Sequence, residues 1–255
     1  MHAPAEILSI YRRFDDYPME NLTKAWYYHL ADGLRQRTVG QMRKHREQYG
    51  LSGNCFDLAL WLIDELRQDQ FSAYGVGHGL HTEDAHVAVV VESKEGYRYL
   101  CDLGDQWLQP MLLDPASPSF CRKPMPGFFP AAYVKAQPAE DSCTMFYYRP
   151  NGKVSQQNYS LRPIGVDELM AAGEVSQHSM HNPLVEMRIP QQEEVAHWEF
   201  SSFQSWLSTS QGKFYDEPAR STAAWAERIN VRTGMSTAVV LEALQFYENL
   251  AGRRG

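Results

Sequence analysis

The chain has 255 residues, 44% of them hydrophobic, and a formal net charge of −7. A chain of this length can form one large domain, or two to three small subdomains, around a substantial core. The acidic balance argues against partners that carry dense negative charge, since proteins that bind nucleic acid or anionic membranes are usually basic. We therefore expect neither a nucleic-acid nor a membrane partner.

The cysteine pattern and the start of the chain favour a reduced compartment. The four cysteines include no Cys-x-x-Cys pair, and the chain is too long for a disulfide-dense miniprotein. The first six residues lack the basic-then-apolar pattern of a signal peptide, and no apolar run approaches the roughly 20 residues of a membrane helix. We expect a soluble, cytoplasmic protein that is a monomer or a homodimer.

The first seventy residues are expected to be helical. Asn21 is placed to cap a helix whose apolar face includes Trp26, Tyr27, Leu30 and Leu34. Thr38 is placed to cap a polar, basic helix that ends near Gly50. A third helix begins around Cys55 and is predicted to be buried, because it carries Leu58, Leu60, Trp61, Leu62, Ile63 and Leu66.

From Phe71 the hydrophobic period changes to that of strands. Residues 87–91 predict a strand buried on both faces, residues 93–96 a tight turn, and residues 97–103 the returning strand. The proline-rich stretch 110–138 predicts a long loop. Further strands are expected at 144–148, 159–163 and 184–189. Helices are expected at 195–207, at 221–229 and after Ser236.

Three residues have the chemistry of a thiolate catalyst. Cys55 falls in the first turn of its helix, where unpaired backbone N–H groups favour a thiolate. His86 enters the first strand of the predicted hairpin, and Asp102 lies sixteen positions later on the returning strand. Paired strands bring side chains on one face to about 4.5–5.5 Å between Cβ atoms. We predict that His86 is the base, that Asp102 orients it, and that the buried helix supplies Cys55.

Each of these residues also has a structural interpretation. A lone cysteine in an apolar helix is usually a packed core residue, and a histidine at a strand start is often only hydrogen-bonded. Asp102 is harder to explain in this way, because a carboxylate inside an apolar strand is costly without a partner. Cys101 is assigned to the core, since it points to the opposite face of the strand from Asp102. Cys121 and Cys143 have no partner signal.

A metal site is a rival interpretation of the segment before the first strand. It holds His78, His81, Glu83, Asp84 and His86 within nine positions. The spacing matches no common zinc pattern, and the segment begins with glycines and not with a helix. We therefore expect no metal. The histidines of residues 178–181 are expected in a solvated loop.

Several segments together resemble the arylamine N-acetyltransferase family. That family carries Arg-Gly-Gly-x-Cys-Phe-Glu, a Thr-His strand and an Asp-Val-Gly-Phe-Gly strand end, and the counterparts here are residues 52–57, 85–87 and 102–104. Pro18-Met19-Glu20-Asn21-Leu22 is similar to the family's Pro-Phe-Glu-Asn-Leu segment. Weaker matches are residues 109–113 and 182–184. The resemblance covers roughly residues 5–190.

The resemblance implies an α+β fold: a helical subdomain over 1–70 with the nucleophile, a β-barrel subdomain over 71–190 with His86 and Asp102, and a C-terminal α/β lid over 191–255. It also implies ping-pong acyl transfer, in which Cys55 accepts acetyl from acetyl-CoA and an amine or hydrazine then takes it. Backbone N–H groups near Cys55 are the expected oxyanion donors. The sequence has no glycine-rich phosphate loop, so it predicts no CoA-binding residues.

The chain departs from the family pattern at two places. Leu51 or Ser52 replaces the arginine before the glycines, and that arginine normally pairs with the acid after Cys-Phe, which is here the shorter Asp57. Asp105-Gln106 replaces Phe-Gly after the aspartate. The chain is thus identified as a divergent member. The alternatives are a transglutaminase- or protease-like amide hydrolase with the same triad, and a catalytically silent binding protein of the same fold.

Overall fold

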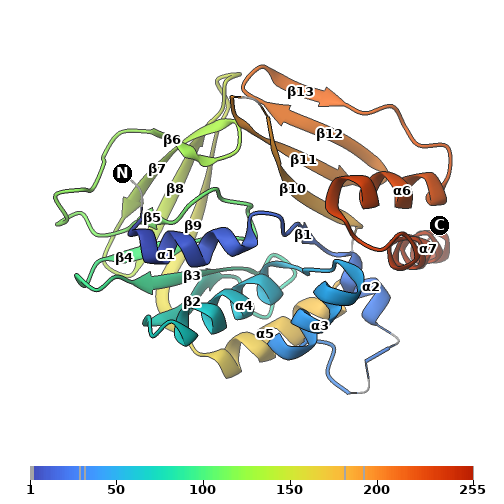
Figure 1. Cartoon of the computed structure of the whole chain (residues 1–255), viewed down its shortest axis with the longest axis horizontal. Coiled ribbons are helices and arrows are strands. Elements are labelled where there is room, and N and C mark those ends of the chain that lie inside the picture. Colours follow the sequence, from blue (N-terminus) through green and yellow to red (C-terminus); the bar gives the residue numbers. More distant parts are fainter. Residues whose placement is uncertain (1–2, 29, 32, 181, 192, 255) are drawn as a thin grey trace.

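The computed structural model describes residues 3–28, 30–31, 33–180, 182–191 and 193–254. It consists of two antiparallel sheets and the helices that pack on them (Figure 1). The helices in the described residues are α1 (Ala5–Tyr11), the 3-10 turn η1 (Arg12–Phe14), α2 (Leu22–Tyr27), α3 (Val39–Tyr49), α4 (Cys55–Gln68), α5 (Val166–His178), α6 (Thr222–Thr233) and α7 (Thr237–Arg254).

The larger sheet has eight strands in the order β5-β4-β3-β2-β9-β8-β7-β6, and it curls into a barrel-like shape (Figure 1). All its neighbouring strands are antiparallel. The strands are β2 (Ala73–His78), β3 (His86–Glu92), β4 (Arg98–Cys101), β5 (Met111–Leu112), β6 (Met125–Phe129), β7 (Ala132–Pro138), β8 (Ser142–Tyr148) and β9 (Val154–Ile164).

The smaller sheet joins the two ends of the chain. Its order is β1-β10-β11-β12-β13, so the short β1 (Met19–Glu20) lies at one edge beside β10 (Leu184–Pro190). The other strands are β11 (Val195–Ser201), β12 (Gln204–Thr209) and β13 (Gly212–Tyr215). The division of the chain at residue 190 stays a prediction. Strand pairing groups β10 with the C-terminal strands and not with the barrel-like sheet.

Two hydrophobic cores hold these layers together. In the first, α4 packs against β2 and β3, with Phe56, Leu62 and Val89 almost fully buried. In the second, α6 and α7 cover one face of the smaller sheet, where Trp198 and Trp225 are buried. The first core fixes the nucleophile helix against the hairpin that carries the predicted base.

The caps of α3 and α4 explain where both helices begin. Thr38 Oγ1 accepts from the Gln41 N–H at 3.3 Å, and Gly50 ends α3 with φ of +72°, as predicted. Asn54 Oδ1 accepts from the backbone N–H groups of the second and third residues of α4 at 3.0 and 3.2 Å. These bonds satisfy donors that a helix N-terminus otherwise leaves unpaired, so Cys55 is the first residue of a well-defined helix.

Three secondary-structure predictions are wrong. Residues 195–207 form strands β11 and β12 instead of a helix, because Ala196, Trp198 and Phe200 are buried with a period of two. The predicted loop over 110–138 contains β5, β6 and β7. The predicted apolar face of α2 does not extend to Leu30 and Leu34, since the helix ends at Tyr27 and these side chains are 54% and 68% exposed.

The predicted α+β class is confirmed by the two antiparallel sheets and their helices. The predicted hairpin is present, with β3 and β4 paired through Val89 and Cys101. Helix α5 has no counterpart among the helices that the sequence predicts. None of the helices in the described residues has the length and apolar character needed to cross a membrane.

Candidate active site

The loop before Cys55 is held by a buried carboxylate. The fully buried side chain of Glu20 accepts from the Gly53 N–H at 2.7 Å and from the Thr23 N–H at 2.7 Å. Gly53 has φ of +107°, and a Cβ there would lie 2.1 Å from Asp57 Oδ2, so no other residue fits. The upstream segment that resembles the family therefore positions the start of α4.

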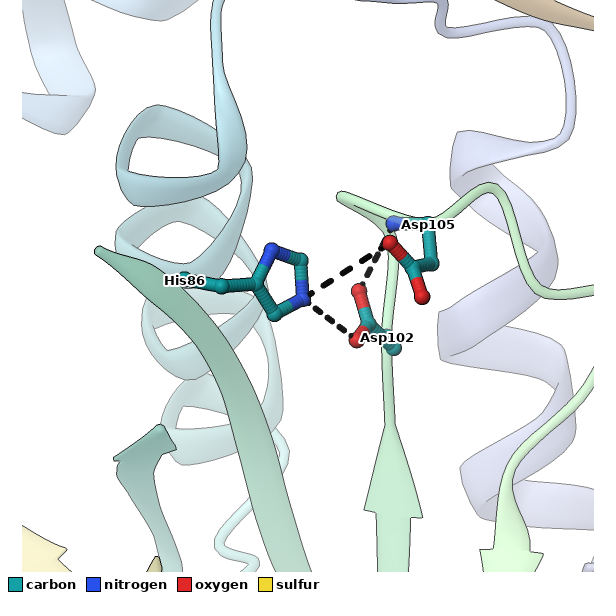
Figure 2. Close-up of side chains that lie close together, drawn as sticks. All are labelled: His86, Asp102 and Asp105. Carbon is teal, nitrogen blue, oxygen red and sulfur yellow. Dashed lines mark hydrogen bonds and ion pairs between the residues drawn. The ribbon is translucent and has the colours of Figure 1, made fainter. Parts of the chain in front are cut away.

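His86 and Asp102 meet where the hairpin opens. His86 begins β3, and Asp102 follows the last residue of β4. The register pairs Val89 with Cys101, so Asp102 falls opposite the residue two positions after His86, on the same face. His86 Nε2 lies 2.7 Å from Asp102 Oδ2 (Figure 2). The predicted contact is present, two residues out of the predicted register.

Cys55 lies against this pair around Gly104. A Cβ at Gly104 would be 2.7 Å from Cys55 Cβ, 3.0 Å from His86 Cε1 and 3.3 Å from Asp102 Oδ1. The three predicted residues therefore converge on one glycine that has no room for a side chain. Because Nε2 of His86 is taken by Asp102, the other ring nitrogen is left to interact with the Cys55 sulfur.

The charges of the site favour a protonated imidazole. Burial alone would lower the pKa of His86, but the carboxylates of Asp102 and Asp105, with hydrogen bonds to Asp102 and Cys55, raise that pKa well above its ordinary value. Burial would raise the pKa of Asp102, yet the charge and hydrogen bond of His86 hold it below its ordinary value. The pair is thus a carboxylate–imidazolium ion pair near neutral pH.

Two further groups saturate the Asp102 carboxylate. The Tyr159 hydroxyl donates to Oδ2 at 2.7 Å, and the Asp105 backbone N–H donates to Oδ1 at 2.8 Å. Asp102 is fully buried, so these bonds replace its lost hydration. The sequence has no signal for Tyr159, because β9 reaches the site only through the order of strands in the sheet.

A buried arginine from another segment pairs with Asp57. Arg37 Nη2 lies 3.2 Å from Asp57 Oδ2, and both side chains are 1% exposed. Arg37 also donates to the Ser52 carbonyl at 2.9 Å. The position before the glycines lacks an arginine, but the loop before α3 supplies the same charge to the acid of α4.

Asp105 adds a second carboxylate beside the imidazole. Its Oδ1 lies 3.9 Å from His86 Nε2 (Figure 2), and its Oδ2 accepts from the Tyr147 hydroxyl at 3.2 Å. Burial and the charge of Asp102 raise the pKa of Asp105 to about 6. Where the family pattern has an aromatic residue, this chain therefore has a titratable group in the site.

Two adjacent cavities open at the site. A cavity of about 190 Å³ is lined by Cys55 and His86, together with Lys24. A larger one of about 490 Å³ lies between the two sheets, with lining residues from β8, β9 and β10–β13. Asp105 and Glu186 line both. A molecule in the larger cavity is therefore next to the space in front of the thiol.

The structure does not assemble the rival metal site. Among the described residues, the candidate ligand groups are His86 with Asp102 and Asp105, and Glu186 with His197 and Glu199. Neither group includes His78, His81, Glu83 or Asp84. Of the residues expected in a solvated loop, His178 ends α5, and His181 lies outside the described residues. Cys101 is 1% exposed in the core, as predicted.

The chain matches no family model and no curated protein. Its structure is nevertheless similar to solved arylamine N-acetyltransferases. That of Mycobacterium marinum in complex with CoA has a TM-score of 0.70 at 11% identity, covering 95% of this chain and 92% of that chain. The enzyme of Salmonella typhimurium has a TM-score of 0.71 at 12% identity, covering 96% of this chain and 93% of that chain. The enzyme of Nocardia farcinica has a TM-score of 0.71 at 16% identity, covering 94% of this chain and 86% of that chain.

The likeness extends over nearly the whole length of each protein, at identities too low to carry activity from one to another. It agrees with the resemblance that the sequence motifs predict. The chain has the fold of the arylamine N-acetyltransferases.

Proposed function

We propose that the protein is an acyl-CoA-dependent N-acyltransferase that works through an acyl-thioester on Cys55. The observation that carries this proposal is the convergence of Cys55, His86 and Asp102 around Gly104 at the start of a buried helix. A thiolate beside an imidazolium is a potent nucleophile at neutral pH. The fold, shared with enzymes of which one was solved with CoA, supports the acyl donor.

In the first half-reaction, the Cys55 thiolate attacks the acyl carbonyl of acyl-CoA. The bond between the carbonyl carbon and the CoA sulfur breaks, and the CoA thiolate takes the proton of the His86 imidazolium. In the second, an amine attacks the Cys55 thioester and gives a proton to neutral His86, which restores the thiolate–imidazolium pair. The oxyanion donor at the start of α4 is the Cys55 backbone N–H, because Asn54 Oδ1 already accepts from the N–H groups of Phe56 and Asp57.

The larger cavity is suited to the donor. Arg149, Lys153 and Lys213 line it, and guanidinium and ammonium groups bind phosphates. CoA carries its phosphates far from its sulfur, so they can lie at these residues while the thioester reaches the cavity at Cys55. We propose this cavity as the acyl-CoA site and an amine or hydrazine as the acceptor.

The test is incubation with acetyl-CoA followed by mass spectrometry of the intact protein. We expect a gain of one acetyl group, absent in Cys55→Ala, and loss of this group when an amine is added. An unlabelled protein with every short acyl-CoA, together with a thiol that iodoacetamide does not alkylate near neutral pH, would contradict the proposal. An acetyl group that water removes as fast as any amine would assign a hydrolase instead.

A further inference from the structure

Three side chains outside the triad form a polar cluster in the wall of the larger cavity. Glu186 on β10 is directly opposite Glu199 on β11, and His197 is two positions before Glu199 on the same face. One ligand atom from each of the three lies within 4.8 Å of the others. Like charges directly opposite each other destabilise a sheet. The cluster is thus an unfavourable arrangement that a bound cation would stabilise.

The cluster has no ion pair with a cation of the protein. Within the described part of the chain, neither glutamate lies within ion-pair distance of a lysine or arginine. Burial raises the pKa of Glu199, and the charges of Lys213 and Arg149 offset part of this rise. Arg188, next along the same face, donates to the backbone carbonyls of Trp107 and Phe14. Lys213 Nζ lies 3.5 Å above the Trp206 ring. Neither of these two cations therefore forms an ion pair with the glutamates.

His197 supplies an unused acceptor. The residue is 8% exposed, and its Nε2 is buried without a hydrogen-bond partner, 3.7 Å from Glu186 Oε1. Burial and the charges of Arg149 and Lys213 lower the pKa of His197 to about 4, so the ring is neutral near pH 7. Burial, with the charges of Glu199 and Asp105, raises the pKa of Glu186 well above its ordinary value, as expected for a carboxyl without a cation.

Resting on the acyltransferase function proposed above, we propose that Glu186, Glu199 and His197 bind a positively charged group on the acceptor. The acceptor class is then an amine that carries a second, cationic ammonium group. Because Glu186 lines both cavities, the bound cation lies beside the space in front of Cys55. The uncharged amino group of the same molecule reaches the acyl-thioester there.

An ammonium group can donate hydrogen bonds to all three side chains of the cluster, through the two carboxylates and Nε2 of His197. The 3.7 Å between His197 Nε2 and Glu186 Oε1 is also close to the spacing of metal ligands, so the test below includes a chelator.

The experiment compares three acceptors that share an aromatic amino group. 4-(Aminomethyl)aniline carries a distal cation, 4-methylaniline no charge, and 4-aminobenzoate an anion. With saturating acetyl-CoA, we expect kcat/KM for the cationic acceptor to exceed that for the neutral one by about tenfold or more, with the anionic acceptor slowest. In Glu186→Gln and Glu199→Gln, the ratio of cationic to neutral acceptor should fall toward one. The matched control, Glu227→Gln on the exposed face of α6, should keep the wild-type ratio.

Two further measurements separate this inference from the proposed function. Acetylation of Cys55 is followed by mass in every variant, and binding of 4-(aminomethyl)aniline and 4-methylaniline to the unacetylated protein is measured by calorimetry. If Cys55 is acetylated but the acceptors are used equally, the inference is wrong and the acyltransferase stands. If Cys55 is not acetylated, the binding measurement decides on the cation site alone. Tighter binding of 4-(aminomethyl)aniline than of 4-methylaniline, with the difference reduced in Glu199→Gln, supports the site. Equal binding of the two compounds overturns it. A preference that EDTA abolishes would overturn direct contact in favour of a metal.

Discussion

Gly104 shows how much the site depends on the absence of one side chain. It lies between the thiol, the imidazole and the carboxylate, and its missing Cβ leaves room for Cys55 Cβ. A methyl group 2.7 Å from another carbon cannot be accommodated without movement of the backbone on one side. The residue after Asp102-Leu103 is therefore part of the geometry of the site, although it has no functional group of its own.

We expect Gly104→Ala to slow acetylation of Cys55 by about tenfold or more, because displacement of reacting groups by about 1 Å has a cost of this order or larger. The measurement is the rate of the mass gain with acetyl-CoA. Gly165→Ala is the matched control, since a Cβ there meets nothing within 4 Å. An unchanged rate in Gly104→Ala would mean that Cys55 and His86 do not need this spacing.

Ionisation of Asp105 lowers the stability of the folded protein near neutral pH. Its pKa of about 6 lies above that of an unfolded aspartate, so the folded protein retains the proton that the unfolded chain loses between about pH 4 and pH 6. Stability linked to Asp105 is therefore present at low pH and lost as pH rises through about 6. Such a group is retained for function more readily than for folding.

Asp105→Asn should raise the free energy of unfolding near pH 7.5, by an amount on the order of 2 kcal/mol, with no gain near pH 4. Chemical denaturation at both pH values measures this difference. Asp141→Asn provides the comparison, because the Asp141 side chain is 71% exposed. An equal gain at pH 4 and pH 7.5 would contradict the assignment to the ionisation of Asp105.

At the scale of elements, the start of α4 depends on a charge from another part of the chain. Arg37 and Asp57 form an ion pair that is 99% shielded from solvent on both sides, and Gln36 Nε2 donates to Asp57 Oδ1 at 2.9 Å. Removing one partner of such a pair leaves a buried charge uncompensated. The segment before α3 is thus coupled to the helix that carries the nucleophile.

We expect Arg37→Met to lower the free energy of unfolding by about 3–5 kcal/mol. The double variant Arg37→Met/Asp57→Asn should lose less, since no carboxylate is left unpaired. Urea denaturation of the wild-type protein, Arg37→Met and the double variant measures the free energy of unfolding of each. The exposed pair of Arg162 and Asp141, 4.0 Å apart, is the matched control, and Arg162→Met should change stability by about 0–1 kcal/mol. A loss in Arg37→Met no larger than in Arg162→Met would contradict a structural role for the buried pair.

The elements that the sequence predicts well are those with local signals. Thr38 and Gly50 bound α3, and the valines of β3 form a buried strand. The sequence predicts a helix where β11 and β12 form a hairpin, because the two-residue loop, Ser202-Phe203, has positive φ at both positions without the usual glycine or asparagine. Helix α5 has a weak sequence signal because Gly173 lowers its helix propensity, and Gly173 is needed there for the Gln36 side chain to approach.

The residues of the candidate site also divide into those with a local sequence signal and those without one. Cys55, His86 and Asp102 were predictable because a helix start and a hairpin place them by local rules. Tyr159 and Arg37 were not, since β9 and the loop before α3 approach the triad only through long-range packing. The cluster of Glu186, His197 and Glu199 depends on the pairing of β10 with β11. The sequence predicts a helix where β11 lies, so it does not predict this pairing.

At the scale of the whole molecule, both sheets contribute residues to the candidate site. Figure 1 shows the barrel-like sheet beside the smaller sheet. The barrel-like sheet holds His86 and leads to Asp102, and the smaller sheet supplies Glu186, His197 and Glu199 to the lining of the larger cavity. Each sheet has its own hydrophobic core. The donor and acceptor functions that we propose therefore lie on a boundary between two separately packed bodies, where ligand sites are common.

The edge strand β1 also sets an order of assembly during synthesis. Glu20 ends β1 and holds the Gly53 N–H, while β1 pairs with β10, in which Glu20 lies opposite Val185. Val185 emerges from the ribosome long after Cys55 does. The nascent chain thus exposes its thiol well before the strand that secures the loop in front of it exists, and the nucleophile is fixed only when most of the protein has been made.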